Sequence, residues 1–377
     1  MSDFSQQDYK FMQRAISLAK RGHFTTSPNP RVGCVIVLNG EIVGEGFHHK
    51  TGQGHAEVYA LKQAGIKAKG ATAYVTLEPC SHYGLTPPCA EALVKAQVSH
   101  VIAAMVDPNP KVSGRGLEIL AAAGITSQFG LLEQDARALN PGFIRLMTTQ
   151  LPYVRCKLAA SLDGKTAMAN GESQWITSAE ARTDVQRLRA QSCAVICGAD
   201  SVIFDQARMN VRWHALGELK RDYAEADIRQ PIRVIIDGQN RLSPDLAIFQ
   251  EASKILLIRH TIENDQLWPH FVEQVLIDKA ENSEHINLSL LLMYLAKQGM
   301  NDVLIESGGQ LSGAFISQDL VDELILYQAP KLMGNDGKGL VNMPAVVQLS
   351  EAKNLEIKDI RMVGKDIRLM AIFKHKG

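Results

Sequence analysis

Blocks of hydrophobic and polar residues alternate along the first 145 residues, with the lengths of helices and strands. Residues 5–21 carry apolar side chains at helical spacing, and Ser5 followed by Asp8 resembles a capping box at the start of that helix. The apolar run 32–38 predicts a buried strand, and Asn39-Gly40 predicts a hairpin turn into the next strand. Further strands are predicted at residues 41–47, 71–77, 101–106 and 125–129, and helices at 55–64, 90–97, 117–123 and after Leu131. This alternation is typical of an α/β domain with an open sheet.

The pattern restarts after residues 148–152, which read as a short linker, so domains are expected at residues 1–147 and 148–377. In the second part, strands are predicted at residues 153–160, 193–197, 231–237, 254–259, 274–277, 302–306 and 323–327, and helices at 179–189 and 288–297. Two strand-like runs, 355–362 and 367–373, favour a hairpin at the end of the chain. The polar stretch 210–229 is expected to be a surface excursion. The second part is therefore predicted to be another α/β domain that ends in antiparallel strands.

Composition narrows the class of protein. Hydrophobic residues make up 46% of the 377 residues, which is enough for a core in each of two domains. Lys and Arg together number 40, as do Asp and Glu, whereas a non-specific nucleic-acid binder normally has a basic excess. The polar start of the chain lacks a signal-peptide core, and no run of about 18 apolar residues could span a membrane. Six cysteines are too sparse for a disulfide scaffold. We therefore expect a cytoplasmic protein without nucleic-acid or membrane partners.

The stretch 54–91 gathers the side chains of a metal site. His55 stands two residues before Glu57, and Cys80 and Cys89 each follow a proline. Imidazole and thiolate are preferred ligands of Zn²⁺, and three protein ligands leave one tetrahedral position for water. Glu57 is not needed as a ligand and can carry a proton from that water to departing ammonia. One His, two Cys and a non-ligand Glu are the residue set of a zinc deaminase.

Two other interpretations of this stretch stay open. Without a metal, the two cysteines would be ordinary small buried side chains. A closed structural zinc site would instead need a fourth protein ligand. The candidates for that ligand are Cys34, His48, His49 and His82. The spacing is also unusual, because deaminases commonly have Cys-x-x-Cys, whereas eight residues separate Cys80 from Cys89.

The long spacing between Cys80 and Cys89 narrows the possible families of deaminase. The segments 76–89 (TLEPCSHYGLTPPC), 27–33 (SPNPRVG) and 46–48 (GFH) resemble the deaminase half of the bacterial bifunctional riboflavin-biosynthesis deaminase–reductases. The resemblance implies a cytidine-deaminase-like three-layer domain in which Asn29 and His48 face the pyrimidine. Residues 107–116 look like the family's loop beside the site. On turn preferences alone, Asn29 could be just a turn residue between two prolines.

The second part carries less chemistry of its own. It lacks a Gly-x-Gly-x-x-Gly motif between its first strand and helix, so a standard dinucleotide fold is not supported. Residues 306–313 (ESGGQLSG) lie between a predicted strand and a helix. Glycines there would let backbone amides approach a phosphate at the helix N-terminus, although many such turns are only turns.

Four motifs of this part resemble the reductase half of the same family: residues 157–165 (KLAASLDGK), 173–177 (SQWIT), 188–190 (LRA) and 209–212 (MNVR). The resemblance implies a dihydrofolate-reductase-like α/β fold that uses NADPH. It implies that the cofactor is lined by Ala159, Trp175, Ser201, Asp205, Gly308, Gly309, Gln310, Leu311, Ser312, Gly313 and Ala314. It implies that the ribosyl-phosphate substrate is held by Ser173, Arg189, Met209, Arg212 and Glu306. Asp205 is also a candidate proton relay in catalysis.

Alternatives remain for several of these residues. Arg189 could lie on a solvated helix face, and Trp175 could be core packing. Lys157 could be a proton donor or a charge at a strand end. The family usually has Asp-Asp-Pro or Asp-Asn-Pro where this chain has Asp205-Gln206-Ala207, so the loop that carries Arg212 is expected to be looser. The family often has Thr where this chain has Ser201, and the serine keeps the hydroxyl group.

The resemblance as a whole implies a two-step enzyme of riboflavin synthesis. The first domain, with one Zn²⁺, would deaminate 2,5-diamino-6-ribosylamino-4(3H)-pyrimidinone 5′-phosphate by hydrolysis. The second would reduce the ribosyl group to ribityl with NADPH. A homo-oligomer, either a dimer or a tetramer, is expected. The competing classes are a nucleic-acid base deaminase with an appended binding domain and a non-enzymatic zinc-stabilised ligand-binding protein.

Overall fold

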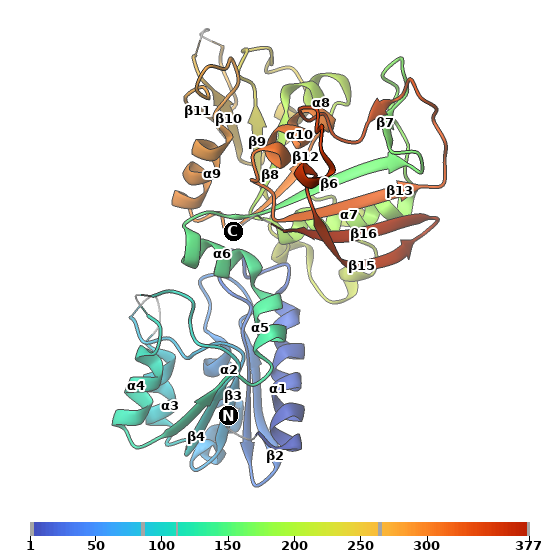
Figure 1. Ribbon diagram of the computed structural model, residues 1–377. Coiled ribbons are helices and arrows are strands. Elements are labelled where there is room, and N and C mark those ends of the chain that lie inside the picture. Colours follow the sequence, from blue (N-terminus) through green and yellow to red (C-terminus); the bar gives the residue numbers. More distant parts are fainter. Residues whose placement is uncertain (1–3, 84–86, 111, 263–265, 375–377) are drawn as a thin grey trace. The chain divides into compact units, whose positions relative to one another are not determined.

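The computed structural model describes residues 4–83, 87–110, 112–262 and 266–374. The chain divides into two units, Met1–Gln150 and Leu151–Gly377, and each is built on its own sheet (Figure 1). None of the helices in these residues combines the length and the apolar character needed to cross a membrane.

A five-stranded sheet forms the middle of the first unit. Its order is β2-β1-β3-β4-β5, with β1 antiparallel to both neighbours and β3, β4 and β5 parallel to one another. The strands are β1 Gly33–Leu38, β2 Glu41–Phe47, β3 Thr72–Val75, β4 His100–Ala103 and β5 Thr126–Phe129. Asn39 and Gly40 both have positive φ (52° and 81°), as the turn between β1 and β2 requires.

Helices cover both faces of this sheet. One face is covered by α1 Gln6–Ala19, α5 Glu133–Leu139 and α6 Pro141–Thr149, and the other by α2 Ala56–Ala64, α3 Cys89–Lys95 and α4 Arg115–Ala122. Side chains of β1 alternate between the two cores: Val35 packs under α1, whereas Ile36 packs under α2 and α3. Short 3₁₀ turns lie at Lys20–Gly22 and Gly65–Ala68. The unit therefore has three layers, as expected for a cytidine-deaminase-like domain.

The second unit is built on a nine-stranded sheet of order β11-β10-β9-β8-β12-β6-β13-β16-β15. Strands from β11 to β13 run parallel, and β16 and β15 add an antiparallel edge. The strands are β6 Tyr153–Ser161, β8 Ala194–Gly198, β9 Ile232–Ile236, β10 Ile255–Arg259, β11 Val272–Leu276, β12 Asp302–Glu306, β13 Glu323–Ala329, β15 Leu355–Val363 and β16 Asp366–Phe373. A separate pair joins β7 Lys165–Ala167 to β14 Lys338–Gly339.

Two helical layers enclose this larger sheet. One consists of α7 Ala179–Gln191 and α8 Ala199–Phe204, and the other of α9 Leu288–Lys297 and α10 Gly309–Ser317. Short 3₁₀ turns follow at Trp213–Ala215, Gly217–Arg221, Glu225–Asp227, Ala247–Gln250 and Leu349–Glu351. The architecture is the dihydrofolate-reductase-like α/β fold that the sequence predicted.

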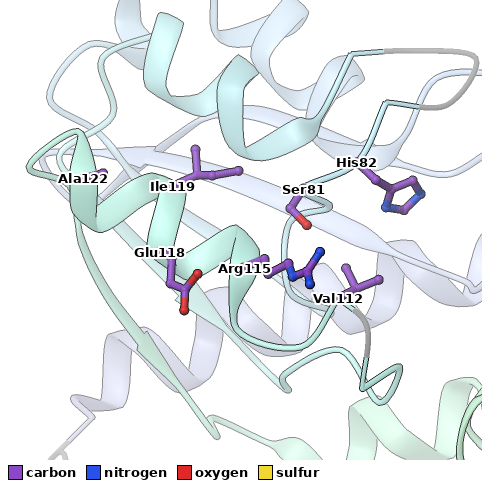
Figure 2. A pocket seen from close by; sticks show the side chains of 7 residues that line it. All are labelled: Ser81, His82, Val112, Arg115, Glu118, Ile119 and Ala122. Carbon is purple, nitrogen blue, oxygen red and sulfur yellow. The ribbon is translucent and has the colours of Figure 1, made fainter.

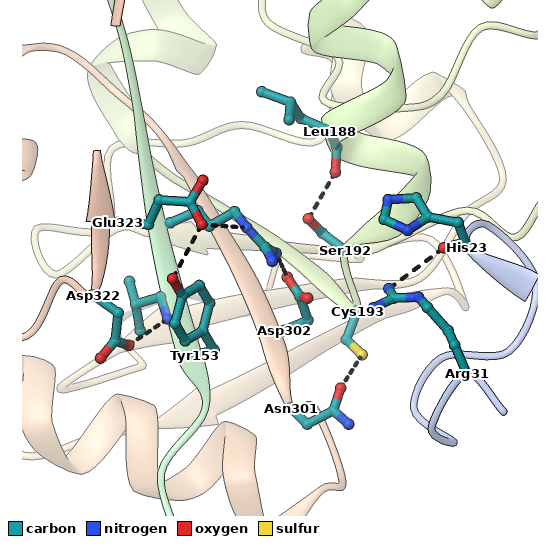
Figure 3. A network of polar contacts seen from close by, with 12 residues as sticks. His23, Arg31, Tyr153, Leu188, Ser192, Cys193, Asn301, Asp302, Asp322 and Glu323 are labelled. Carbon is teal, nitrogen blue, oxygen red and sulfur yellow. Dashed lines mark hydrogen bonds and ion pairs between the residues drawn. The ribbon is translucent and has the colours of Figure 1, made fainter. Parts of the chain in front are cut away.

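A buried ionic network ties three of the parallel strands together. The guanidinium of Arg155 on β6 bonds to Asp302 on β12 and, at 3.1 Å, to Glu323 on β13. Figure 3 labels the two acidic partners, Asp302 and Glu323. The hydroxyl of Tyr153 donates to the same Glu323 oxygen at 3.1 Å. The two carboxylates raise the pKa of Arg155 above its ordinary value, although burial alone would lower it. This network therefore stays charged inside the unit.

Most of the predicted elements are confirmed, with shifts of one to three residues at their ends. The terminal hairpin is present as β15 and β16. The linker prediction is wrong for Thr148 and Thr149, because α6 continues through them and ends where Gln150 turns to a positive φ of 60°. The helical pattern after Leu131 is two helices, separated at Asn140 before Pro141.

The stretch 210–229 is only partly a surface excursion. It contains three short 3₁₀ turns, and Val211 and Leu216 are 4% and 0% exposed. Because the stretch is polar on average, its sequence did not indicate that these two apolar side chains are buried. The helix α8, which carries Ser201, has no counterpart among the predicted elements because it spans only six residues.

Candidate active sites in the two units

The ends of two helices bring the predicted zinc ligands together. His55 is the N-cap of α2, and Cys89 is the first residue of α3. His55 Nδ1 lies 3.2 Å from Cys89 Sγ and 3.4 Å from Cys80 Sγ. These three residues are the one group of three or more potential ligands within the part of the chain that the structure describes.

The geometry fits a zinc ion. Ligand atoms at Zn–S of about 2.3 Å and Zn–N of about 2.0 Å in a tetrahedron stand roughly 3.5 Å apart. The observed separations approach that value, and the three ligand atoms all lie within 4.8 Å of one another. Hydrogen bonds from Cys89 and His55 lower the pKa of Cys80 below the ordinary thiol value, which favours the thiolate that a metal ligand requires. None of the candidate fourth ligands belongs to the described group, which leaves the open position of a catalytic site.

Glu57 lies in the first turn of α2 and is only 3% exposed. Its Oε2 atom is buried and has no hydrogen-bond partner among the described residues. Burial raises the pKa of Glu57 to about 7, with a further contribution from Cys80. A buried carboxyl group with an unused oxygen beside a metal site is suited to exchange protons.

Asn29 and His48 face each other next to the ligands. Asn29 Nδ2 lies 3.3 Å from His48 Nε2, and His48 Nδ1 lies 3.0 Å from the carbonyl of Gly54. The ring of His48 also meets the ring of His55 edge-on, with centroids 5.6 Å apart. Because Nδ1–H donates to Gly54, Nε2 of the neutral ring accepts from Asn29. Asn29 is therefore more than the turn residue that its neighbouring prolines allow.

Glu78 is a residue of this site that the sequence did not single out. It is 4% exposed, and its carboxylate accepts three backbone N–H groups: Asp107 and Gly114 at 3.0 Å and Gly116 at 2.9 Å. Glu78 therefore fastens the loop that begins at Asp107 to the segment that carries Cys80. A Cβ added to Gly116 would stand 2.0 Å from the carbonyl oxygen of Pro79, so only glycine permits this approach.

A hollow lies next to that loop. Figure 2 shows side chains of α4 and of the segment after Cys80 around it. They are Ser81, His82, Val112, Arg115, Glu118, Ile119 and Ala122. Arg115, the first residue of α4, thus shares this space with His82.

In the second unit, Arg189 of α7 meets Glu306 at the end of β12. Arg189 Nε and Nη2 donate to the two Glu306 oxygens at 2.6 and 2.9 Å, and both side chains are about one-tenth exposed. The alternative of a solvated helix face for Arg189 is wrong. Lys157 on β6 lies opposite Glu306 on β12 in the strand register, and burial lowers the pKa of Lys157. Two cationic side chains, Arg189 and Lys157, thus lie near the carboxylate of Glu306, the last residue of β12.

The Gly-rich turn forms the N-terminus of α10, with Gly308 as the N-cap. A Cβ at Gly308 would meet no atom within 4 Å, whereas a Cβ at Gly313 would stand 2.0 Å from the carbonyl oxygen of Asn342. Ser307 and Ser312 hydroxyls lie 2.9 Å apart beneath the turn. The open approach at Gly308 and the helix N-terminus fit a phosphate of NADPH.

Three further residues of the predicted cofactor and substrate sets lie together. Ser173 Oγ donates to Asp205 Oδ1 at 3.2 Å, and Gln174 Nε2 donates to the Asp205 carbonyl at 3.1 Å. Trp175 is 61% exposed, with the guanidinium of Arg182 4.6 Å above its ring. Core packing is therefore wrong for Trp175.

The remaining predicted residues lie in less direct positions. Met209 is 2% exposed, so its side chain belongs to the core rather than to an open surface. Ala159 lies on β6 opposite Tyr327, and Ser201 lies on α8. Gln310, Leu311 and Ala314 belong to α10.

Comparison with known proteins covers both units. Residues 5–105 match the family model of the cytidine and deoxycytidylate deaminase zinc-binding region, and residues 152–369 match that of the RibD C-terminal domain. The chain is 52% identical to riboflavin biosynthesis protein RibD of Escherichia coli K12, over 96% of this chain and 98% of that protein. It is 50% identical to the protein of the same description from Haemophilus influenzae, over 98% of each.

Solved structures agree over nearly the whole length. Acinetobacter baumannii RibD is 46% identical with a TM-score of 0.89, over 98% of this chain and 99% of that one. The diaminohydroxyphosphoribosylaminopyrimidine deaminase / 5-amino-6-(5-phosphoribosylamino)uracil reductase of Thermotoga maritima is 31% identical with a TM-score of 0.85, over the same shares. With both family models matched in order and relatives aligned from end to end, the chain belongs to the RibD family of riboflavin-biosynthesis proteins.

Proposed function

We propose that the first unit deaminates 2,5-diamino-6-ribosylamino-4(3H)-pyrimidinone 5′-phosphate at the His55–Cys80–Cys89 site, and that the second reduces the ribosyl group of the product. The chain is a bifunctional deaminase and reductase of riboflavin biosynthesis, with zinc and NADPH as its cofactors. The assignment of individual residues to the two reactions is the proposal.

In the deaminase, Glu57 carries the protons. His55, Cys80 and Cys89 would hold Zn²⁺, and a zinc ion there would lower the pKa of a water molecule toward neutrality. Glu57 accepts a proton from that water and delivers it to the amino group, which leaves as ammonia while the ring carbon gains oxygen. Asn29 and His48 hold the pyrimidine ring through hydrogen bonds. The buried Glu57 Oε2, unpaired among the described residues and placed on the same turn as His55, is the single observation that carries this assignment.

In the reductase, Arg212 and Arg189 attract the substrate phosphate, and Glu306 fixes Arg189 in place. Guanidinium groups suit phosphate through charge-assisted, fork-shaped hydrogen bonds. NADPH supplies the hydride for this step. The N-terminus of α10 and Trp175 hold the cofactor, and Asp205, fixed by Ser173, is a candidate proton relay. With Asp205→Asn, hydride transfer should slow; near-normal turnover would exclude the relay.

The experiment that tests the proposal couples three measurements on the purified protein: bound zinc, ammonia release and NADPH oxidation with the pyrimidine substrate. Glu57→Gln should keep its zinc, should keep oxidising NADPH when the deaminated pyrimidine is supplied directly, and should lose ammonia release by at least about 100-fold. Retention of ammonia release would remove Glu57 from the mechanism. If the unaltered protein releases ammonia without consuming NADPH, the proposed reductase activity of the second unit would be contradicted.

Family membership over nearly the whole chain does not favour the rival of a nucleic-acid base deaminase. We further propose that the protein works as a homo-oligomer, a dimer or a tetramer, in the cytoplasm and without nucleic-acid or membrane partners. The zero net charge supports the lack of a nucleic-acid partner. Sedimentation equilibrium would give the oligomeric state, and a monomer at micromolar concentration would overturn that part.

A further inference from the structure

The loop that presents Arg212 has no helix or strand between the end of α8 and residue 213. It also lacks the proline that is usual in the family at position 207. Such a loop would be expected to move, which would make Arg212 a poor anchor for a ligand. The backbone of residues 210–212 is nevertheless held by side chains from two other parts of the unit.

One face of α7 contacts both ends of this short segment. Arg189 Nη1 donates to the carbonyl of Asn210 at 2.9 Å, and the amide N–H of Arg212 donates to Gln186 Oε1 at 2.9 Å. Gln186 and Arg189 are three residues apart on the helix and therefore share a face. Gln186 is only 6% exposed, so the hydrogen bond that fixes Arg212 is shielded from water.

Gln230 holds the middle of the segment. The N–H of Val211 donates to Gln230 Oε1, and Gln230 Nε2 donates back to the carbonyl of Val211, both at 2.8 Å. This two-bond closure resembles the pairing of neighbouring strands, with a side-chain amide in place of a second backbone. The Val211 side chain is buried, which fastens the same residue from its other side.

The charge around Arg212 makes this restraint necessary. Burial lowers the pKa of Arg212, and the cationic side chains of Arg189 and Arg208 lower it further. Repulsion among three guanidinium groups would push an unrestrained loop outward. Glu251, which accepts hydrogen bonds from Arg208 and Asn210, and Glu306, which pairs with Arg189, offset part of this repulsion.

We propose that Gln186 and Gln230 are positioning residues of the reductase, which hold Arg212 ready for the phosphate of the substrate. The inference rests on the proposed role of Arg212 in phosphate binding. The two glutamines hold the backbone of Val211 and Arg212 by hydrogen bonds. Their effect is exerted on binding of the substrate, because a loop that is already ordered does not lose entropy when the anion arrives.

The test replaces each glutamine by methionine, which keeps the volume and removes the hydrogen bonds. Gln186→Met and Gln230→Met should each raise KM for the phosphorylated substrate about tenfold and change kcat less than about twofold. KM for NADPH and the ammonia release of the first unit should stay unchanged. Gln298→Met, at an exposed position after α9, is the matched control and should behave as the unaltered protein. A fall in kcat with unchanged KM would overturn the inference.

A double-mutant cycle with Arg212→Met separates this inference from the proposed function. If Gln186 acts through Arg212, Gln186→Met adds less than about twofold to KM once Arg212 is replaced. If the increases in KM caused by Gln186→Met and Arg212→Met instead multiply in the double variant, Gln186 acts by a route other than Arg212, and the inference would fail. If Arg212→Met itself leaves KM unchanged while inorganic phosphate inhibits as before, the proposed phosphate role of Arg212 fails instead.

Discussion

Arg189 and Glu306 form a two-point ion pair inside the second unit, with Nε–Oε1 and Nη2–Oε2 distances of 2.6 and 2.9 Å. The pair joins α7 to the end of β12, 117 residues further along the chain. It also leaves Arg189 Nη1 for the carbonyl of Asn210. Through Arg189, this ion pair thus links the carboxyl end of β12 to the position of the loop that carries Arg212.

The first prediction concerns the pH dependence of this ion pair. Burial alone would raise the pKa of Glu306, but Arg189 and its hydrogen bonds, together with Lys157, lower it below the ordinary 4.5. A carboxyl group with a lowered folded pKa contributes stability that is fully present above the unfolded pKa and is lost as pH falls through the folded pKa. Glu306→Gln should therefore cost about 3 kcal/mol at pH 7 and progressively less from about pH 4.5 downward. Urea unfolding at several pH values measures the difference.

Tryptophan fluorescence suits that measurement, because Trp175, Trp213 and Trp268 are the chain's three tryptophans and all lie in the second unit. Glu273→Gln is the control, since Glu273 forms an ion pair with Lys254 in which both side chains are half exposed. Glu273→Gln should lower the free energy of unfolding by less than about 1 kcal/mol at any pH. A loss for Glu306→Gln that stays constant down to pH 3 would contradict the linkage.

The second prediction concerns the buried network of Arg155. Arg155→Met should lower the free energy of unfolding of the second unit by about 3–5 kcal/mol, because it leaves Asp302 and Glu323 buried without a counter-charge. Denaturant unfolding followed by tryptophan fluorescence measures it. The triple variant Arg155→Met, Asp302→Asn, Glu323→Gln should recover at least half of that loss. If it unfolds more easily than the single variant, packing of the Arg155 stem rather than charge explains the effect.

Sequence patterns predicted what is local in this molecule. The Asn39-Gly40 turn, the strand runs and the capping box at Ser5 each depend on residues that are close along the chain, and the structure contains them. The candidate metal ligands could be predicted because zinc takes its ligands from few residue types, chiefly His, Cys, Asp and Glu, and the structure brings His55, Cys80 and Cys89 together.

Long-range polar contacts could not be predicted in this way. Glu78 looks like one acidic residue before a proline until its partners, up to 38 residues away, are known. Gln186 occupies an ordinary helical position, and nothing within α7 indicates that the N–H of Arg212 lies against it. These contacts depend on how distant segments pack, which hydrophobic periodicity does not encode.

The third prediction compares two glycines of the cofactor turn. Gly313→Ala should destabilise the second unit by about 2 kcal/mol or more, because its Cβ would overlap the Asn342 backbone at 2.0 Å. Gly308→Ala should fold with unchanged stability, since Gly308 has φ of −69° and open space for a Cβ. It should nevertheless raise KM for NADPH at least fivefold, because the methyl group would stand where a phosphate approaches the helix N-terminus. Thermal unfolding and NADPH titration separate the two, and an unchanged KM in Gly308→Ala would remove the turn from the cofactor site.

The fourth prediction concerns Glu78 and the loop beside the deaminase site. Glu78→Gln keeps the shape but leaves at most two N–H groups with an acceptor oxygen and turns an amide NH₂ toward a third. One buried donor without a partner should cost about 1–3 kcal/mol, and loosening of the loop should lower kcat/KM for ammonia release about tenfold or more. Zinc content should remain normal, and so should NADPH oxidation with the deaminated pyrimidine supplied directly, since the ligands and the second unit are untouched. Glu91→Gln, an exposed change in α3, is the matched control. Loss of zinc from Glu78→Gln would show that the carboxylate supports the metal ligands themselves rather than the loop that begins at Asp107.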